Sequence, residues 1–480
     1  MRNMMTLEEV SSAVNGKVVN KSVNGYTPIH ITGVSKDTRT IEEGNIYVAI
    51  DGERFKGHDF TSNAIESGAS CVLVNDADKI PAGAVGIVVE DTVKALGDLA
   101  RAYRFKLGAK VICVTGSVGK TSTREMIACA LSSSFKVFST KRNENNEIGL
   151  PMTILTAPED TEVLVLELGM RLRGEIAYLT EVACPDIAVI TNVGYSHIER
   201  LGSQKEILLA KSEITEGLTE GGILAVNADD ELLFNYSRDN VPIGNGLAGV
   251  RVTTDTSCPT GEVMNCPVMV TGYDVDFEDG CRFKVNISSC GKDFDVKLGL
   301  NGIHNVRNAL FALLCAHLTG ADMTKTTEAL SSYEQMNGRG KVTDKDGIRI
   351  INDAYNAAPE SMKAAFFNLD IMGRGRRKVA VLGGMLELGD YAPLLHEQVG
   401  KDCGAYDIDK IFVTGDNKED FLRGLLAVRP EADCVLCEDT ADIKKKIESF
   451  ASEGDCILFK ASNAFGFEKL AKEMAEETVV

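Results

Sequence analysis

The stretch KVICVTGSVGKT, residues 110–121, decides the fold of this 480-residue chain. An apolar strand runs into a glycine-rich turn, and a helical pattern follows the turn. Glycines let backbone N–H groups approach phosphate oxygens, and the first turn of a helix adds a positive dipole. Val114 stands where the longer form of this motif has its first glycine, so the motif here is the shorter G-x-x-G-K-T. This context predicts a phosphate loop that binds ATP.

The chemistry of such a loop predicts a role for each of its polar residues. Lys120 would neutralise the β- and γ-phosphates, and the Thr121 hydroxyl would bind Mg²⁺. The expected ATP-binding residues of the loop are Gly116, Ser117, Val118, Gly119, Lys120, Thr121 and Ser122. A phosphate loop does not specify the reaction, so further residues have to supply that information.

Three more residues lie at or near the carboxyl edge of the predicted sheet, where open α/β sheets bind ligands. Glu167 ends the strand TEVLVLELG, and His197 follows the strand DIAVITNVG, at the carboxyl edge of the predicted sheet. Glu167 would be a second anchor for Mg²⁺ or would polarise a nucleophile. Lys211 follows on a predicted helix. Taken singly, each of these residues is more typical of an ordinary structural position.

Outward from the loop, short apolar strands alternate with helical segments, which predicts an α/β protein of three domains. We expect a small α/β domain at 1–106 and a central P-loop ATPase domain at 107–333 with a mostly parallel sheet. Between about 250 and 300, apolar and polar residues alternate, which predicts antiparallel hairpins as an insert or extra sheet. After a polar linker at 335–341, four more strands predict a Rossmann-like α/β domain at 334–480.

Composition excludes several classes of function. The chain has 51 Lys and Arg against 70 Asp and Glu, a net charge of −19, which argues against a nucleic-acid binder or a polybasic membrane protein. An apolar stretch long enough for a transmembrane helix is missing, and the N-terminal sequence lacks the apolar core of a signal peptide. We therefore expect a cytoplasmic protein without a membrane span.

Thirteen cysteines without a secretion signal are more typical of reduced thiols than of a disulfide framework. Cys434 and Cys437 form a C-x-x-C pair in a short apolar run, which favours a buried strand over a redox or metal site. Four more cysteines have wide, irregular spacings unlike those of zinc ribbons, although hairpins could still bring them together around zinc: Cys258, Cys266, Cys281 and Cys290.

A series of motifs in a fixed order resembles the Mur ligases of peptidoglycan synthesis nearly end to end. The motifs are SKDTR at 35–39, GERFKGHDF at 52–60, TGSVGKTSTREM at 115–126, TKRNENNEIGLP at 140–151, ELGM at 167–170, TNVGYSHIERLGS at 191–203, AKSEI at 210–214, GIHNVRNAL at 302–310, GRGK at 338–341, NDAYNAAPESM at 352–362 and LGGMLELGDYAPLLHEQVG at 382–400. Within the family, the segment at 140–151 is most similar to the branch that adds a dipeptide.

The resemblance implies an ATP-dependent ligase that joins D-alanyl-D-alanine to UDP-N-acetylmuramoyl-tripeptide through an acyl phosphate. It implies two Mg²⁺ ions, held by Thr121, Glu167, His197 and a Lys211 that the family typically carbamylates. The implied catalytic residues are Lys120, Glu167, His197 and Lys211. Further ATP contacts would come from Asn301, His304, Asn305, Asn308, Arg339, Asp353, Tyr355 and Asn356. The substrates would meet Ser35, Asp37, Thr38, Arg39, Thr140, Asn143, Asn145, Asn146, Lys460 and Ser462. The family is usually monomeric.

Some positions depart from the family pattern. Lys460-Ala461-Ser462-Asn463 stands where the family commonly has Lys-Gly-Ser-Arg, so a cation suited to a carboxylate is replaced by a neutral amide. Two alternatives therefore stay open: a diverged ligase that adds a different amino acid or dipeptide, and a weakly catalytic paralogue that only binds the precursor. The complete set Lys120, Thr121, Glu167, His197 and Lys211 argues against the second alternative.

Overall fold

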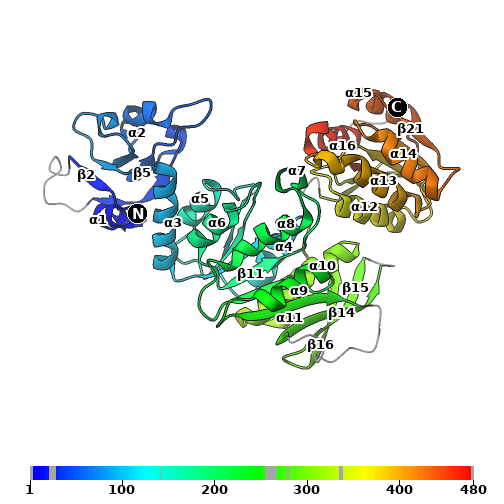
Figure 1. The fold of residues 1–480 in the computed structure, drawn as a ribbon, viewed down its shortest axis with the longest axis horizontal. Helices are drawn as coiled ribbons and strands as arrows, with labels where there is room; N and C mark the ends of the chain where they lie inside the picture. Colours follow the sequence, from blue (N-terminus) through cyan, green and yellow to red (C-terminus); the bar gives the residue numbers. More distant parts are fainter. Residues whose placement is uncertain are drawn as a thin grey trace.

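A computed structural model describes residues 4–20, 29–141, 143–253, 266–277, 280–334 and 339–476 of the protein. Three α/β domains follow one another along the chain, with the two termini in the two outer domains (Figure 1). The predicted three-domain α/β architecture is thus confirmed. Among the described residues, no helix is long and apolar enough to cross a membrane.

The first domain is built around a five-stranded sheet of order β2-β7-β6-β5-β4, in which only the β2–β7 pair is antiparallel. Every residue of β5 and β6 is buried, because helices cover the sheet. The elements are β1 (Met5–Thr6), α1 (Leu7–Ala13), β2 (Lys17–Val19), β3 (His30–Ile31), β4 (Gly33–Ser35), η2 (Thr38–Thr40), β5 (Asn45–Val48), η3 (Gly57–Phe60), α2 (Thr61–Glu66), β6 (Cys71–Val74), η4 (Ala77–Lys79) and β7 (Gly86–Val88).

A long helix, α3 (Thr92–Leu107), joins the first domain to the central one (Figure 1). Asp91 caps its start by accepting hydrogen bonds from the backbone N–H groups of Val93 and Lys94, and Gly108 ends it in a left-handed conformation. Arg104 of the helix donates to the carbonyl oxygens of Ala183 and Cys184 in the central domain. The helix therefore fixes the first domain onto the central one.

The central domain has a nine-stranded sheet of order β16-β15-β14-β13-β12-β11-β8-β10-β9, with β8 between β10 and β11. Its elements are β8 (Lys110–Thr115), α4 (Lys120–Ser132), β9 (Val137–Ser139), α5 (Gly149–Thr156), β10 (Val163–Glu167), α6 (Glu175–Ala183), β11 (Ile187–Ile190), α7 (Ile198–Leu201), α8 (Gln204–Ser212), η5 (Glu213–Thr215), β12 (Ile223–Asn227), α9 (Glu231–Asn240), β13 (Gly246–Val252), β14 (Val268–Asp276), β15 (Cys281–Ile287), β16 (Lys292–Leu298), α10 (Ile303–Thr319) and α11 (Met323–Ser331).

The predicted antiparallel hairpins do not form a sheet of their own. β14 pairs in parallel with β13 and then antiparallel with β15, so the hairpins extend the parallel sheet at one edge. Along β15 buried and exposed residues alternate, because one face packs on α10 and the other faces solvent. α10 is buried along most of its length in the core that joins both parts of the sheet.

The third domain has a six-stranded sheet of order β17-β18-β22-β19-β20-β21, parallel except for the β17–β18 hairpin. The four predicted strands are β19, β20, β21 and β22, whereas the hairpin was not predicted. The elements are β17 (Lys341–Lys345), β18 (Ile348–Asn352), α12 (Pro359–Met372), β19 (Arg377–Leu382), η6 (Gly389–Tyr391), α13 (Ala392–Gly404), β20 (Lys410–Val413), α14 (Lys418–Val428), β21 (Cys434–Leu436), α15 (Thr440–Phe450), β22 (Asp455–Lys460), η7 (Asn463–Phe465) and α16 (Phe467–Glu476).

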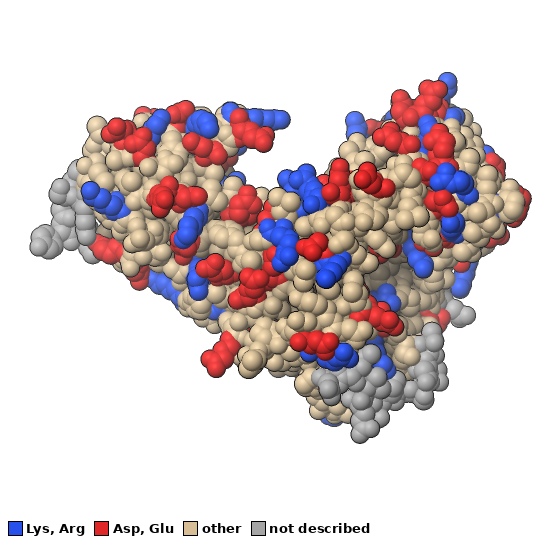
Figure 2. Space-filling view, in the orientation of Figure 1, with Lys and Arg blue, Asp and Glu red and all other residues tan. Residues whose placement is uncertain are grey.

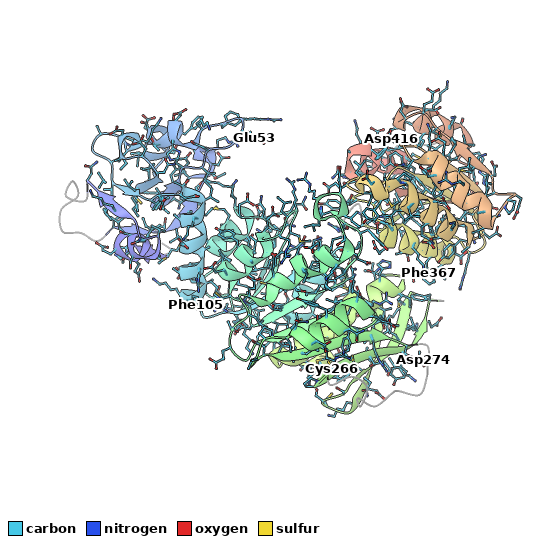
Figure 3. All side chains as sticks on the ribbon, in the orientation of Figure 1. Glu53, Phe105, Cys266, Asp274, Phe367 and Asp416 are labelled. Carbon is cyan, nitrogen blue, oxygen red and sulfur yellow. The ribbon has the colours of Figure 1, made fainter. Side chains whose placement is uncertain are left out.

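A wide gap separates the two outer domains above the central one (Figure 2). Glu53 of the first domain and Asp416 of the third lie on opposite sides of this gap (Figure 3). The third domain nevertheless contacts the central domain directly, since the ring of Phe367 on α12 packs edge-on against Phe277 with centroids 5.4 Å apart. The functional site lies at this boundary.

Candidate active site

A cavity of about 1410 Å³ lies between the central and third domains. Its lining brings together the phosphate loop, the end of β10, the start of α10 and residues that flank β18 and α12. Twenty of the predicted site residues line it: Gly116, Ser117, Val118, Gly119, Lys120, Thr121, Ser122, Asn143, Asn145, Asn146, Glu167, His197, Lys211, His304, Asn308, Arg339, Asp353, Tyr355, Asn356 and Lys460.

The phosphate loop has the predicted strand–turn–helix geometry. Gly119 has φ +85° at the start of α4, and Gly116 has φ +151° with Thr191 so close that a Cβ would lie 1.9 Å from the threonine Oγ1. Both positions therefore require glycine. The Lys120 Nζ donates to the carbonyl oxygen of Gly116 at 2.8 Å, and burial lowers the pKa of this lysine.

Asn192 braces the loop from the end of β11, and sequence reasoning did not single it out. Its Oδ1 accepts hydrogen bonds from the backbone N–H groups of Ser117 at 3.1 Å and Val118 at 2.9 Å, and its Nδ2 donates to the Val118 carbonyl oxygen. Thr191 donates to the same carbonyl oxygen at 2.7 Å. The motif TNVGYSH marked the segment, but periodicity could not show which side chain reaches the loop.

Glu167 lies at the end of β10 beside the first turn of α4. Its Oε2 accepts a hydrogen bond from the Thr121 hydroxyl at 2.8 Å, and its Oε1 accepts one from Asn145 at 2.9 Å. Its backbone N–H donates to the Thr140 hydroxyl, so Thr140 supports the carboxylate without lining the cavity. The buried Arg124 guanidinium lies 3.8 Å from the Glu167 carboxylate. The Thr121 hydroxyl and the Glu167 carboxylate therefore lie side by side at the cavity, and both are hard oxygen ligands for a metal ion.

Lys211 is almost completely buried on α8. Burial, aided by the positive charge of Lys120, lowers the pKa of Lys211 well below its ordinary value. A lower pKa increases the fraction of a lysine that carries the neutral amine, which is the form that reacts with CO₂ or other electrophiles.

His197 has a backbone φ of +65° directly before α7. Its Nδ1 lies 2.6 Å from the Glu387 carboxylate of the third domain, so Nε2 is the ring nitrogen left for a ligand. Burial and the charge of Lys120 lower the pKa of this histidine. Glu387 is a second residue that sequence reasoning missed, because its partner is far away in the chain.

The segment around Glu387 holds the third domain on α7. The Glu387 carbonyl oxygen accepts from the Glu199 N–H at 3.3 Å, and the Tyr391 hydroxyl donates to the Gly202 carbonyl oxygen at 3.0 Å. Glu360 of α12 makes another contact between these domains, since its Oε1 accepts from the Tyr195 N–H at 3.2 Å. The third domain therefore reaches the site with two carboxylates.

Residues of α10 form the wall of the cavity behind the loop. Asn308 accepts a hydrogen bond from the Thr123 hydroxyl at 2.9 Å, which links α10 to α4. Burial lowers the pKa of His304 to about 4, so this ring is neutral at physiological pH. Asn301 and Asn305 do not line the cavity. Asn305 donates to the Asn301 carbonyl oxygen instead, which places both in the start of the helix.

Third-domain residues close the opposite wall. The Arg339 guanidinium stacks on the Tyr355 ring at 4.1 Å, and the Tyr355 hydroxyl donates to Asn143 of the central domain. The buried Lys460 ammonium lies 3.0 Å from the Asp353 carboxylate and donates to the Asn356 carbonyl oxygen. Ser462 does not line the cavity; its hydroxyl accepts from the Leu386 N–H, next to the segment that docks on α7.

The predicted first-domain residues form a separate turn away from this cavity. Asp37 accepts hydrogen bonds from the Arg39 backbone and guanidinium, and the guanidinium lowers the pKa of Asp37 to about 2. The Ser35 hydroxyl donates to the Asp37 carbonyl oxygen, and Thr38 begins the short helix η2. The Arg39 side chain is largely exposed, which leaves it accessible to a ligand in the gap.

The cysteines do not form a metal site within the described part of the chain. Among those residues, no group of three His, Cys, Asp or Glu side chains is arranged to hold a metal ion. Cys258 lies outside the described residues, and Cys266 and Cys281 are buried free thiols. Cys434 begins the predicted strand, β21, and Cys437 directly follows its end. The three residues of β21 are half-buried, and burial raises the pKa of Cys434 to about 12.

Three family models match the chain in the order of its domains. Residues 30–104 match the Mur ligase family catalytic domain, residues 114–316 the Mur ligase middle domain, and residues 338–463 the Mur ligase glutamate ligase domain. Together these matches span most of the chain and cover all three structural domains.

Individual relatives match over nearly the whole length. The chain is 36% identical to the UDP-N-acetylmuramoyl-tripeptide--D-alanyl-D-alanine ligase of Bacillus subtilis strain 168, over 98% of each chain. A crystal structure of MurF from Acinetobacter baumannii superposes with a TM-score of 0.84 at 27% identity, covering 99% of this chain and all of that one. MurF ligase from Thermotoga maritima in complex with ADP superposes with a TM-score of 0.77 at 28% identity, covering 93% and 97%.

Proposed function

The chain belongs to the Mur ligase family, and we propose that it joins D-alanyl-D-alanine to UDP-N-acetylmuramoyl-tripeptide with ATP, in peptidoglycan precursor synthesis. One observation carries the proposal: the phosphate loop, Glu167, His197 and Lys211 line one cavity with third-domain residues. A ligase of this kind has to bring ATP, a carboxylate and an amine to one place. The Bacillus subtilis relative, which matches nearly end to end, carries this activity in its name.

The first half of the reaction activates the carboxylate. A carboxylate is a poor acyl donor, so the γ-phosphoryl group of ATP is transferred to it to give an acyl phosphate and ADP. The free N–H groups at the start of α4 and the Lys120 ammonium would hold the phosphates. Asn192 would maintain the conformation of the loop, since its side chain already accepts hydrogen bonds from the Ser117 and Val118 N–H groups.

The residues at the site fit Mg²⁺. Thr121 and Glu167 offer adjacent oxygen donors, and a magnesium ion with few protein ligands completes its shell with phosphate oxygens and water. Bound there, Mg²⁺ would supply charge neutralisation of the phosphates. His197 and Lys211 would hold a second ion. Lys211 suits this only as a carbamate, and its lowered pKa favours that modification because a neutral amine reacts with CO₂.

We infer the remaining substrate contacts from the family resemblance and from the domain to which each residue belongs. Asp37, Thr38 and Arg39 would hold the uridine diphosphate end in the first domain, while Asn143, Asn145 and Asn146 would meet the muramoyl-peptide. Arg339, Tyr355 and Asn356, with His304 and Asn308, would enclose ATP. Lys460 and Ser462 would help to place the dipeptide. We further propose a monomer of domains 1–106, 107–333 and 334–480 that acts in the cytoplasm.

The test measures phosphate release and product mass together. The purified protein, ATP, Mg²⁺ and UDP-N-acetylmuramoyl-tripeptide should release phosphate only when D-alanyl-D-alanine is added, with the pentapeptide as product. Lys120→Met should lower turnover by about 100-fold or more, because it removes a cation at the transferring phosphoryl group. Release that ignores D-alanyl-D-alanine but responds to another amine would contradict the proposed acceptor and direct attention to Asn463.

A further inference from the structure

Glu360 crosses from the third domain into the active-site cavity. It lies in the first turn of α12, and its Oε1 accepts a hydrogen bond from the Tyr195 N–H at 3.2 Å. A Cβ on Gly194 would lie 2.3 Å from this same oxygen, so the approach depends on a glycine at 194. The carboxylate is therefore held at a fixed place against the segment that connects β11 to His197.

The second oxygen of this carboxylate is buried without a partner. No described residue donates a hydrogen bond to the Glu360 Oε2. A buried carboxylate oxygen without a donor is costly, and such atoms are rare unless a ligand completes them. Glu360 also lines the cavity, and Oε2 is enclosed in the wall, so a ligand donor reaches this oxygen when the carboxylate turns toward the cavity.

The surroundings of Glu360 favour a cationic ligand that also gives up a proton. Asp230, which caps α9, and Lys211 on α8 are the charged groups that act on it most strongly. Asp230 is already satisfied by the N–H groups of Val193 and Leu233, and Lys211 has a lowered pKa, which weakens it as a counter-ion. Burial raises the pKa of Glu360, which makes its carboxylate a better base.

We propose that Glu360 binds the ammonium group of the incoming dipeptide and removes its first proton. This inference rests on the proposed function, in which the amine is the only reacting group that arrives with a positive charge. Because α12 belongs to the third domain, docking of that domain would bring the base to the acyl phosphate together with the amine.

Amide formation conserves atoms and electrons. One N–H proton passes from the ammonium to the Glu360 carboxylate, and the freed lone pair forms a C–N bond to the acyl carbon. The carbonyl electrons move to oxygen and return as the bond between carbon and the phosphate oxygen breaks. Phosphate leaves with that electron pair and takes the second proton of the nitrogen, which leaves the amide. Glu360 then returns its proton to water.

The decisive comparison uses two amines with Glu360→Gln. D-alanyl-D-alanine arrives as an ammonium ion, whereas hydroxylamine is uncharged at neutral pH and needs neither the carboxylate nor the base. We expect amide formation to fall by about 100-fold or more, while hydroxamate formation stays within a few-fold of the parent. Trapping of the acyl phosphate with borohydride should give the parental yield. Glu360→Asp, which keeps the charge, should recover part of the amide reaction.

Two further variants separate this role from general damage. Gly194→Ala would push the Glu360 carboxylate aside, so it should lower the dipeptide reaction more than the hydroxylamine reaction. Glu419→Gln changes an exposed glutamate on α14, outside the cavity, and should behave as the parent. Melting temperature and ADP affinity would verify that each variant folds.

Each result decides the question. Equal losses with both amines, or loss of the trapped acyl phosphate, would assign Glu360 to docking or to the first half-reaction and overturn the proposal. Parental rates with both amines would overturn it too. A parent enzyme that makes hydroxamate but not pentapeptide would instead refute the proposed dipeptide acceptor, which the comparison of variants distinguishes from a failure at Glu360.

Discussion

Asn192 illustrates how a single side chain shapes the active site at the residue scale. One oxygen accepts from two consecutive N–H groups of the phosphate loop, so these groups are already satisfied. The N–H groups at the start of α4 are the ones left for a phosphate. The Asn192 side chain thus occupies the N–H groups of Ser117 and Val118 and leaves those at the start of α4 to bind phosphate.

Replacing Asn192 by Ala should weaken nucleotide binding. The Val118 N–H would lose its acceptor, and the Ser117 N–H would keep only the Asn192 backbone carbonyl oxygen at 3.1 Å. The loop would then be held less firmly in the conformation that directs the start of α4, at a cost of about 1–3 kcal/mol. We expect the Kd for ADP, measured by calorimetry, to rise about 10-fold. Asn240→Ala, at an exposed position on α9, serves as the control; an unchanged Kd for Asn192→Ala would show that the brace is dispensable.

His304 predicts a pH dependence of stability. Its folded-state pKa is about 4, below the ordinary 6.5, so the unfolded chain takes up the proton first. Stability is retained above pH 6.5 and falls as the pH drops towards 4. The contribution is up to about 2 kcal/mol at pH 5. Urea unfolding of His304→Gln should therefore lose less stability between pH 7 and pH 5 than the parent, and equal losses would contradict this.

Local chemistry predicted some site residues and could not predict others. Lys120 and Thr121 follow from a turn that lies between adjacent elements, and Glu167 from its place at a strand end. The roles of Glu360 and Glu387 could not be predicted, because their partners Tyr195 and His197 belong to another domain. Spacing along a chain contains no information about contacts that only form when domains dock.

At the scale of elements, strands with apolar runs were predictable and charged ones were not. The four strands at the centre and one edge of the third sheet are apolar, whereas β17 reads KVTDK and is mostly exposed. Its neighbour β18 is buried, yet the β17–β18 hairpin was not predicted. The charged residues of β17 obscure the alternation of apolar and polar residues by which a strand is predicted. The extension of the central sheet by β14 was also missed, because register with β13 is a long-range property.

The helix α3 gives a prediction for an element that joins two domains. Gly97 faces α6, and a Cβ there would lie 2.2 Å from the Tyr178 hydroxyl oxygen. Alanine normally stabilises a helix relative to glycine, but here overpacking should prevail and destabilise the protein by about 1–3 kcal/mol. Adding Tyr178→Phe removes the clashing oxygen and should restore much of the melting temperature. A stabilised Gly97→Ala protein would show that α3 and α6 pack more loosely.

For the whole molecule, the contacts that matter most join the third domain to the central one. Ring packing of Phe367 on Phe277, the carboxylate of Glu387 on His197 and the Tyr391 hydroxyl on Gly202 all cross the same boundary. The family resemblance predicted that residues of the third domain contact ATP. It did not identify the side chains that hold it: Glu387 and Tyr391 lie within the motif at 382–400, but a motif does not show which of its residues contact another domain.

Weakening this boundary should widen the gap between the outer domains. Phe367→Ala removes a ring contact of about 0.5–1.5 kcal/mol beyond its buried area, which shifts an open–closed equilibrium roughly 2- to 10-fold. Spin labels at Glu53 and Asp416, which face each other across the gap (Figure 3), would report the change as a distance distribution. Leu394→Ala, an exposed apolar residue on α13, is the control. An unchanged distance distribution for Phe367→Ala would show that the polar contacts of Glu387 and Tyr391, and not the ring pair, hold the two domains together.

The order of strands in the central sheet also bears on how the protein is made. β8, which leads into the phosphate loop, lies between β10 and β11, and both of these follow it in the chain. While the chain emerges from the ribosome, β8 is an apolar strand with two open edges until β10 has been synthesised, and with one open edge until β11 ends at Ile190. Open edges pair readily with other chains. During translation, the segment that will bind nucleotide is therefore one whose edges a chaperone would protect.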